Sequence, residues 1–351
     1  LGPARAGNKF KAHGDAATTG AGLNGIGAAA AVFISARTDV TVRRAGKTYV
    51  QCFSRGYPGT FSGTDFDPDA EFVRDDTQKL RGVNNRAPDA HGTSVRILFD
   101  PTVAPDCVID IGEVLLRAQA AVRMCPGVHL RVIDEGWPLG EVPEMLTQPF
   151  DGPWGTDSLL DLMCAAAGAP KPELNLLVEG SGSYTTGRGP TPMRWSVAAG
   201  PAEPATVAAF CNTVRTANGG SHLSAAVRGL TEALADKAGR MRDLGLAKGE
   251  EGPEAQDFAA VTALAVDTRA PDVSWDAQAK TSVSSRSLNL AMVPEVARAV
   301  TVWAATPANA PAVSTWVKLA LESARARRSA EGAKERSRAA SKAKGLRTNL
   351  S

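Results

Sequence analysis

The densest cluster of glycines in the chain, GAGLNGIGA at residues 20–28, could bind a phosphate group. Glycines let the backbone approach a phosphate closely, and free N–H groups at the start of a helix attract an anion. Residues 23–35 are small and apolar and predict a buried helix, so Gly25, Ile26 and Gly27 would supply those N–H groups. A plain glycine-rich turn that caps a buried helix would leave the same pattern, and both interpretations stay open at this point.

Two familiar phosphate-binding motifs do not fit this cluster. Gly20, Gly22 and Gly25 have G-x-G-x-x-G spacing, but a dinucleotide-binding fold needs a strand just before the motif and an acidic residue about 20 positions later. Residues 11–19 predict no strand, and the later position falls near Arg44. The chain contains no G-x-x-x-x-G-K-[ST] sequence, which excludes a P-loop.

The cysteines and histidines offer no metal site. The five cysteines are scattered and contain no C-x-x-C pair, which argues against zinc and against a disulfide framework and favours a reducing, cytoplasmic setting. His13, His91 and His129 have no cysteine or carboxylate at metal-binding spacing. His222 follows two glycines at the start of a predicted helix, where we expect a capping or packing role rather than a catalytic base.

The elements that must position these residues alternate between strands and helices. A chain of 351 residues with 43% hydrophobic residues corresponds to two domains, each with its own core. The order strand, helix, strand, helix predicts α/β layers in both, and Pro170 and Pro172 mark the expected boundary. No run of about 18 apolar residues occurs, so no membrane-spanning helix is expected.

Periodicity and turn residues place the individual elements. Helices are expected at residues 23–35, 109–124, 156–167, 223–236, 288–305 and 312–340. Strands are expected at residues 40–42, 48–53, 93–99, 128–133, 174–178, 193–198 and 258–266, the first two forming a hairpin around AGK. Residues 55–90 and 271–281 predict loops.

Positive charge is concentrated at the end of the chain. Residues 321–351 hold nine Lys and Arg against three Glu, a net charge of +6, whereas the whole chain carries +2. A helix of this composition is either a solvated helix or one that lies near DNA phosphates. The charge of the whole chain does not decide between these alternatives.

Segments of the first domain resemble the ATP-operated subunit of type II DNA topoisomerases, which belongs to the GHKL ATPases. Residues 22–28, GLNGIGA, resemble that family's second glycine box. Residues 5–10, RAGNKF, resemble the start of its ATP lid, usually written H-A-G-G-K-F. Residues 42–47 fit the hairpin that follows the glycine box, and residues 91–97, HGTSVRI, resemble the family's G-T-x-V-x-F strand.

The second domain carries the longer match. Residues 210–223, FCNTVRTANGGSHL, resemble the transducer signature F-x-N-x-I-x-T-x-x-G-G-T-H-L. Residues 278–280, QAK, stand where the transducer's Q-T-K loop is expected, and the helix at residues 312–328 resembles its exit helix. A mismatch-repair-type GHKL ATPase would share the glycine box but not residues 210–223.

The resemblance implies a fold and a domain order. The fold class is α/β, an α+β sandwich, in which the C-terminal part of a GHKL (Bergerat) ATPase domain precedes a transducer of ribosomal-protein-like βαβ fold with a left-handed crossover. The implied domains are residues 1–169 for the ATPase part with its lid, 170–325 for the transducer, and 326–351 for a basic exit helix towards a missing Toprim domain.

In this family two ATPase domains dimerise over bound ATP and close a gate on DNA. The resemblance implies that Lys280 and Gln278 reach the γ-phosphate from the second domain, although each lysine could instead be a solvated surface charge. Thr93 would lie near adenine and Arg44 beside the nucleotide. The full implied ATP-binding set is Lys9, Gly22, Leu23, Asn24, Gly25, Ile26, Gly27, Arg44 and Thr93.

The implied cofactors are ATP and Mg²⁺, and the implied partners are DNA, a DNA-cleaving A-type subunit and a second ATPase domain in an ATP-dependent homodimer at the nucleoid. The family's catalytic Glu and Mg²⁺-binding Asn are expected upstream of Leu1, because the chain contains no E-x-x-x-N-x-x-D helix. We therefore expect ATP hydrolysis from the full-length protein and not from this segment alone.

Two departures point to a divergent paralogue rather than a housekeeping gyrase. Asn24 replaces the His common in gyrase subunits, and Ala279 removes the hydroxyl of Q-T-K. The alternative function is a catalytically inactive GHKL relative that acts as a nucleotide-binding, dimerisation or regulatory module.

Overall fold

The structure is a computed structural model of the chain. It describes residues 27–63, 66–67, 69–78, 82–84, 89–106, 108–125, 127–133, 155–170, 172–173, 176–241 and 245–348, and the side chains of the last helix as far as residue 335. The contacts between residues divide the described chain into one unit that ends at Asp110 and a second that begins at Ile111.

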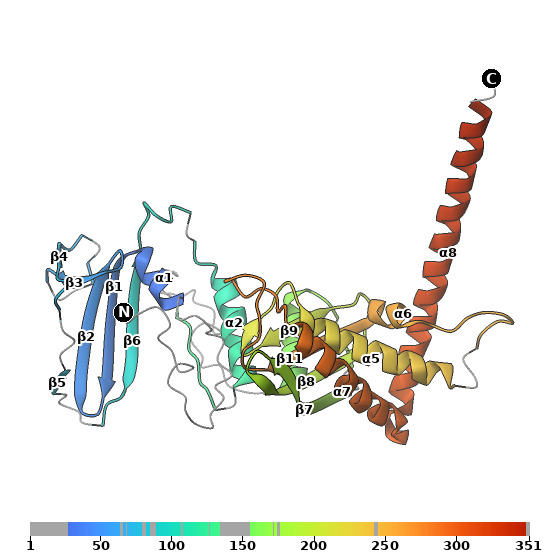
Figure 1. The fold of residues 1–351 in the computed structure, drawn as a ribbon, viewed down its shortest axis with the longest axis horizontal. Helices are drawn as coiled ribbons and strands as arrows, with labels where there is room; N and C mark the ends of the chain where they lie inside the picture. Colours follow the sequence, from blue (N-terminus) through green and yellow to red (C-terminus); the bar gives the residue numbers. More distant parts are fainter. Residues whose placement is uncertain are drawn as a thin grey trace, which may run out of the picture. The chain divides into compact units, whose positions relative to one another are not determined.

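The first unit is built on an antiparallel sheet (Figure 1). Its strands are β1 (Ser35–Arg44), β2 (Lys47–Ser54), β3 (Tyr57–Phe61), β4 (Phe72–Arg74), β5 (Gly82–Asn84) and β6 (Gly92–Phe99). The strand order is β4-β3-β2-β1-β6, with β5 paired to β2. Helix α1 (Gly27–Phe33) leads directly into β1.

The expectations for this unit are met in part. The predicted hairpin is confirmed, with Ala45 and Gly46 at the turn between β1 and β2, both at positive φ. The strand predicted at residues 93–99 is β6, but most of its residues are exposed rather than buried. The loop predicted over residues 55–90 is wrong in part, because β3, β4 and β5 lie there and are too short to show alternation.

The second unit has one five-stranded sheet with helices on both faces. Its strands are β7 (Leu176–Thr186), β8 (Gly189–Pro201), β9 (Val207–Cys211), β10 (Val214–Arg215) and β11 (Thr262–Arg269), in the order β10-β9-β11-β8-β7. Its helices are α2 (Ile111–Met124), α4 (Thr156–Ala166), α5 (Ser221–Gly239), α6 (Ala255–Ala260), α7 (Arg286–Ala305), the short 3-10 helix η2 (Pro307–Asn309) and α8 (Ala310–Thr348). Strands β9 and β11 run parallel, and α5 lies in the connection between them.

Alternation along the strands gives each face of this sheet its own core. Val197 and Val266 face a large core that they share with Leu230 of α5 and Met292 of α7, two helices that lie side by side in Figure 1. Ala265 faces the smaller core under α4. Since α2 and α4 belong to this packing, the second unit begins at Ile111, whereas the boundary expected from the sequence was residue 170.

Two elements of the second unit differ from expectation. Strand β11 begins at Thr262, because Phe258 belongs to α6 and is completely buried there. Residues 128–133 form no strand, and Val128 and Ile133 are exposed at 40% and 57%. An apolar run alone could not separate a buried strand from an exposed connection.

The first arginines of the basic tail are bound by the protein itself. Arg325 Nε donates to Glu250 Oε1 at 2.6 Å, and the hydrogen bond lowers the pKa of Glu250 to about 2. Arg328 donates to the carbonyl oxygens of Glu251 and Gly252, both at 2.8 Å. These guanidinium groups are therefore bound by the protein rather than merely solvated, while a position of the basic tail near DNA phosphates stays a prediction.

Arg327 joins α8 to α6 through a buried carboxylate. Its Nε and Nη2 donate to the two oxygens of Asp257 at 2.8 and 3.0 Å. The Asp257 side chain is only 1% exposed and also accepts the backbone N–H of Glu254 in a capping box. The hydrogen bonds from Arg327 and Glu254 lower the pKa of Asp257 against the opposing effect of burial.

We expect Arg327→Met to lower the melting temperature by several degrees, because it leaves the Asp257 carboxylate buried without its cation. Arg325→Met is the matched control, since its partner Glu250 keeps more contact with water and the Arg325 side chain is 48% exposed. Thermal unfolding of the two variants measures the difference. Equal shifts would contradict a special role for the pair of Arg327 and Asp257.

Candidate functional site

The segment that carries Gln278 and Lys280 is a structured loop, residues 270–285, which we call the QAK loop. It connects the end of β11 to the start of α7. Trp275 and Val283 form an antiparallel bridge across it, and Ser284 N donates to Ser274 O at 2.8 Å. The loop is thus a hairpin whose tip is formed by residues 277–281.

Hydrogen bonds fix the backbone of this tip. The Asp276 carboxylate accepts the N–H groups of Ala277 and Ser282 at 2.9 and 3.2 Å. Lys280 N donates to Ala277 O at 3.0 Å, and Lys280 has a φ of 58°, in the left-handed region. Gln278 is exposed and Lys280 is half-buried. The structure therefore brings the two predicted γ-phosphate ligands together on one shaped tip.

The first end of the QAK loop is tied to Asn212 of the transducer signature, residues 210–223. Asn212 Nδ2 donates to Ala270 O at 2.7 Å, and Ala270 N donates to Asn212 Oδ1 at 2.9 Å. Both residues are almost completely buried. The Tyr184 hydroxyl donates to the carbonyl of Pro271, and burial raises the pKa of Tyr184 well above its usual value.

The second end of the loop meets the two glycines of the same signature. Ser221 N donates to Val283 O at 2.7 Å, and Val283 N donates to Gly219 O at 3.3 Å. Gly220 has a φ of 119°, and a Cβ there would lie 2.3 Å from Val283 O and 2.4 Å from Val283 N. Only glycine allows this approach, so the signature forms a cradle for the QAK loop.

His222 is buried in the first turn of α5. Its Nε2 lies 3.2 Å from Thr216 Oγ1, which donates to Ala209 O at 3.0 Å. Burial lowers the pKa of His222 to about 4, so the ring is neutral at pH 7. It packs against the signature as expected, although the N-cap of α5 is Gly220.

The predicted nucleotide-binding residues of the first unit are described only in part. Gly27 opens α1, Arg44 ends β1, and Thr93 lies in β6 opposite Val42. Val42 and Arg44 are two positions apart on β1, so their side chains lie on the same face of the sheet. Thr93 is paired with Val42 and lies on that face too. Six predicted residues lie outside the described part of the chain: Lys9, Gly22, Leu23, Asn24, Gly25 and Ile26.

Sequence patterns did not reveal most of the residues that hold the QAK loop. Tyr184 stands in no motif, and nothing in the sequence pairs it with the loop. Asp276 lies within the loop, but no motif marks it as the residue that holds the tip. Asn212 and Gly220 were noted as parts of the signature. Their role as anchors follows only from the contacts with Ala270 and Val283.

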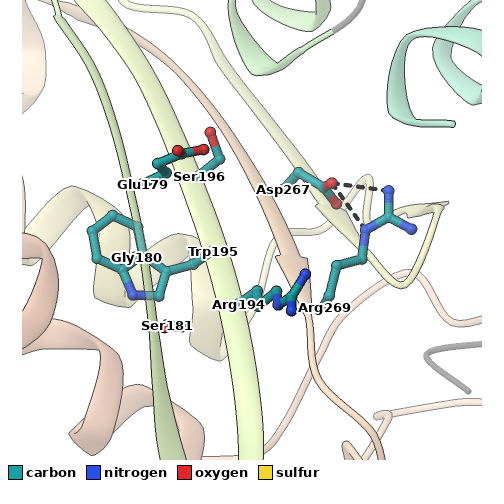
Figure 2. Close-up of a pocket in the computed structure, with 8 residues that line it drawn as sticks. All are labelled: Glu179, Gly180, Ser181, Arg194, Trp195, Ser196, Asp267 and Arg269. Carbon is teal, nitrogen blue, oxygen red and sulfur yellow. Dashed lines mark hydrogen bonds and ion pairs between the residues drawn. The ribbon is translucent and has the colours of Figure 1, made fainter. Parts of the chain in front are cut away.

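A polar pocket of about 430 Å³ lies on strands β7, β8 and β11 of the second unit. Figure 2 shows Asp267 and Arg269 paired there, with Nε and Nη2 of Arg269 each 3.0 Å from Asp267 Oδ2. Burial raises the pKa of Asp267, and Arg269 Nη2 also donates to Met124 O at 3.0 Å. This ion pair thus ties the end of α2 to the sheet.

Other site types receive no support from the described residues. No three or more His, Cys, Asp or Glu side chains gather there in a way that could hold a metal ion. Likewise, within the described segments no helix is long and apolar enough to cross a membrane.

Known proteins match both units of this chain. The DNA gyrase B family profile matches residues 173–336, which contain the cradle and the QAK loop. The topoisomerase subunit TopoN of Mycolicibacterium smegmatis is 77% identical over all 351 residues. The chain is a gyrase B-like protein. It spans 50% of the length of TopoN.

More distant proteins share part of the sequence or the fold. The DNA gyrase B protein of Mycobacterium leprae is 24% identical to the gyrase B-like chain over 130 residues, which are 37% of this chain and 16% of that protein. The 43K ATPase domain of Thermus thermophilus gyrase B, solved with an aminocoumarin, has a TM-score of 0.55 at 21% identity, over 89% of this chain and 74% of that one. The topoisomerase IV ATP-binding domain of Francisella tularensis, solved with an inhibitor, has a TM-score of 0.57 at 16% identity, over 86% and 73%. The predicted mixed α/β fold is confirmed and matches the fold of GHKL ATPase and gyrase B structures, whereas the division into ATPase part and transducer and the handedness of the crossover stay predictions.

The contact between Gly220 and Val283 predicts the effect of adding one methyl group. Gly220→Ala should destabilise the gyrase B-like chain by roughly 3 kcal/mol or more, because the backbone is strained and the Cβ meets backbone atoms. Gly239→Ala, at the other end of α5, is the control, since its Cβ meets nothing within 4 Å. Urea unfolding compares them, and an equally tolerated Gly220→Ala would refute the close approach.

Burial of His222 predicts a pH dependence of stability. The folded pKa of about 4 lies below the ordinary 6.5, so the unfolded chain binds the extra proton between these values. Stability is unaffected above pH 6.5 and falls as pH drops towards 4, by up to about 3 kcal/mol from this group. His222→Gln should remove that part of the slope in unfolding measured from pH 4 to 7. Parallel profiles for the two proteins would contradict the buried, neutral ring.

Proposed function

We propose that this chain belongs to a B-type subunit of an ATP-dependent type II DNA topoisomerase, in which it binds ATP and transmits the state of the nucleotide. The first unit holds the nucleotide, with Thr93 near adenine, Arg44 beside the nucleotide, and Lys9 and the glycine box from Gly22 to Gly27 around the triphosphate. Gln278 and Lys280 bind the γ-phosphate. The proposed domains are the ATPase part at residues 1–169, the transducer at residues 170–325 and the basic exit helix at residues 326–351. In this division α2 and α4 belong to the ATPase part by sequence and pack on the sheet of the second unit.

The exposed sheet face of the first unit suits a nucleotide. Thr93 stands on it between Val42 and the half-exposed Val95, and Arg44 follows at the end of β1. Apolar side chains with one hydroxyl fit a purine ring, and a guanidinium fits a phosphate. When bound, ATP supplies a terminal phosphate whose charge is lost from the site after hydrolysis.

The observation that carries the proposal is the shaped tip of the QAK loop. Lys280 is a compact cation on a flexible stem, and Gln278, two positions away, adds an amide donor. The loop is bonded to Asn212 at one end and to Gly219 and Ser221 at the other. A force on the tip is therefore passed to the sheet and to α5 and α7 rather than absorbed by loop bending.

In this proposal DNA, a DNA-cleaving A-type subunit and a second copy of the ATPase domain are the partners, Mg²⁺ accompanies ATP, and the protein works in the cytoplasm at the nucleoid. The resemblance to the family and the 77% sequence identity to the topoisomerase subunit TopoN support these partners and this location. Closure of two ATPase domains over ATP would drive the DNA gate, with α8 as the exit from the transducer.

We expect Lys280→Ala to weaken the response to a non-hydrolysable ATP analogue by about tenfold or more, because a charge-assisted contact to the γ-phosphate is lost. Gln278→Ala should weaken it less. The response is measured on the full-length protein as analogue-induced dimerisation, with ADP as the comparison ligand. Lys318→Ala, an exposed lysine on α8, is the matched control.

Three outcomes separate the possibilities. A γ-phosphate contact is supported if Lys280→Ala weakens the response to the ATP analogue and leaves the response to ADP unchanged. Equal behaviour of Lys280→Ala and Lys318→Ala rejects it. Analogue binding without any ATP hydrolysis by the full-length protein would favour the inactive nucleotide-binding or regulatory relative instead.

A further inference from the structure

A pocket of about 330 Å³ lies within the second unit, between helix α2, the β9–β10 hairpin and the tip of the QAK loop. Its floor is apolar, with Leu116 and Met124 from α2, Phe210 from β9 and Val214 from β10. Phe210 is completely buried, and Leu116 and Met124 pack on the core under α4. The side chains of the floor are therefore held in place by their packing against the core.

The rim of this pocket carries an excess of positive charge. Glu113 accepts from Arg117 at 3.0 Å and lies 3.5 Å from Arg215. Among the described residues that line the pocket, Glu113 is the single acidic one, and its carboxylate faces two guanidinium groups. Each guanidinium has five N–H donors, and a shared carboxylate leaves several of them for another anion.

We propose that this pocket binds a small organic anion, a carboxylate attached to an apolar aryl or alkyl body. The apolar part lies on Leu116 and Met124, which are only partly buried, and the carboxylate pairs with Arg215 and Arg117. The volume falls in the range of small-molecule sites, and an apolar floor with few convergent polar groups is their usual composition.

The occupant of the pocket also touches the QAK loop. Ala279 and Thr281, on either side of Lys280, line the pocket. Asn218 N donates a hydrogen bond to Thr281 O at 2.9 Å. A bound anion therefore favours one position of the tip and changes the response to nucleotide, and the reverse holds by linkage. This consequence rests on the proposed function, whereas binding of the anion does not.

The test titrates the full chain, without nucleotide, with phenylbutyrate and with phenylbutanol, which has the same apolar body and no charge. Calorimetry should give about tenfold tighter binding of the acid, because only the acid pairs with the arginines. Arg215→Gln and Arg117→Gln should each remove most of that preference. Arg228→Gln, an exposed arginine on α5 paired with Glu232, should leave it unchanged.

A second variant tests the apolar part of the pocket. Ala121→Phe places a ring inside the pocket and should abolish binding of both compounds, with folding verified by its thermal unfolding curve. If this variant does not fold, the arginine variants decide alone. Equal affinity for acid and alcohol, no binding of either, or an unchanged preference in Arg215→Gln would overturn the proposal while leaving the nucleotide experiment unaffected.

Discussion

The close approach of the backbone at Gly220 to the backbone at Val283 is the constraint on which the rest of the second unit depends. It joins the start of α5 to the end of the QAK loop, two segments far apart in the sequence. The contact has no room for a side chain at Gly220. Because α7 begins three residues after Val283, the same contact fixes where α7 packs beside α5.

Buried polar pairs fix the register between the transducer signature and the QAK loop. The Asn212 side chain forms hydrogen bonds with both the N–H and the C=O of Ala270, and the Thr216 hydroxyl forms one with Nε2 of the His222 ring. A buried amide or ring without such partners would cost free energy, so these pairs allow only one register between the signature and the loop. Apolar residues of the same size would bury similar area without fixing that register.

Charge serves different purposes in different parts of the molecule. Arg327 is committed to a buried carboxylate that holds α8 on α6, although the sequence shows it only as part of a basic tail. Arg117 and Arg215 share a single carboxylate beside the QAK loop. Arginines thus stabilise the fold through a buried carboxylate at one place and share a partly exposed carboxylate at another.

The sequence by itself determined the family, the signature at residues 210–223 and most helices of the second unit, because motifs and helical periodicity are local patterns. It also indicated that Gln278 and Lys280 belong to one functional loop. It could not show the strands β3, β4 and β5, which are too short for alternation, nor the exposure of β6. Only the tertiary structure decided that Tyr184 and Gly220 hold the loop, and that Arg327 binds a buried carboxylate. Those facts depend on contacts between residues distant in the chain, and such contacts leave no periodic trace in the sequence.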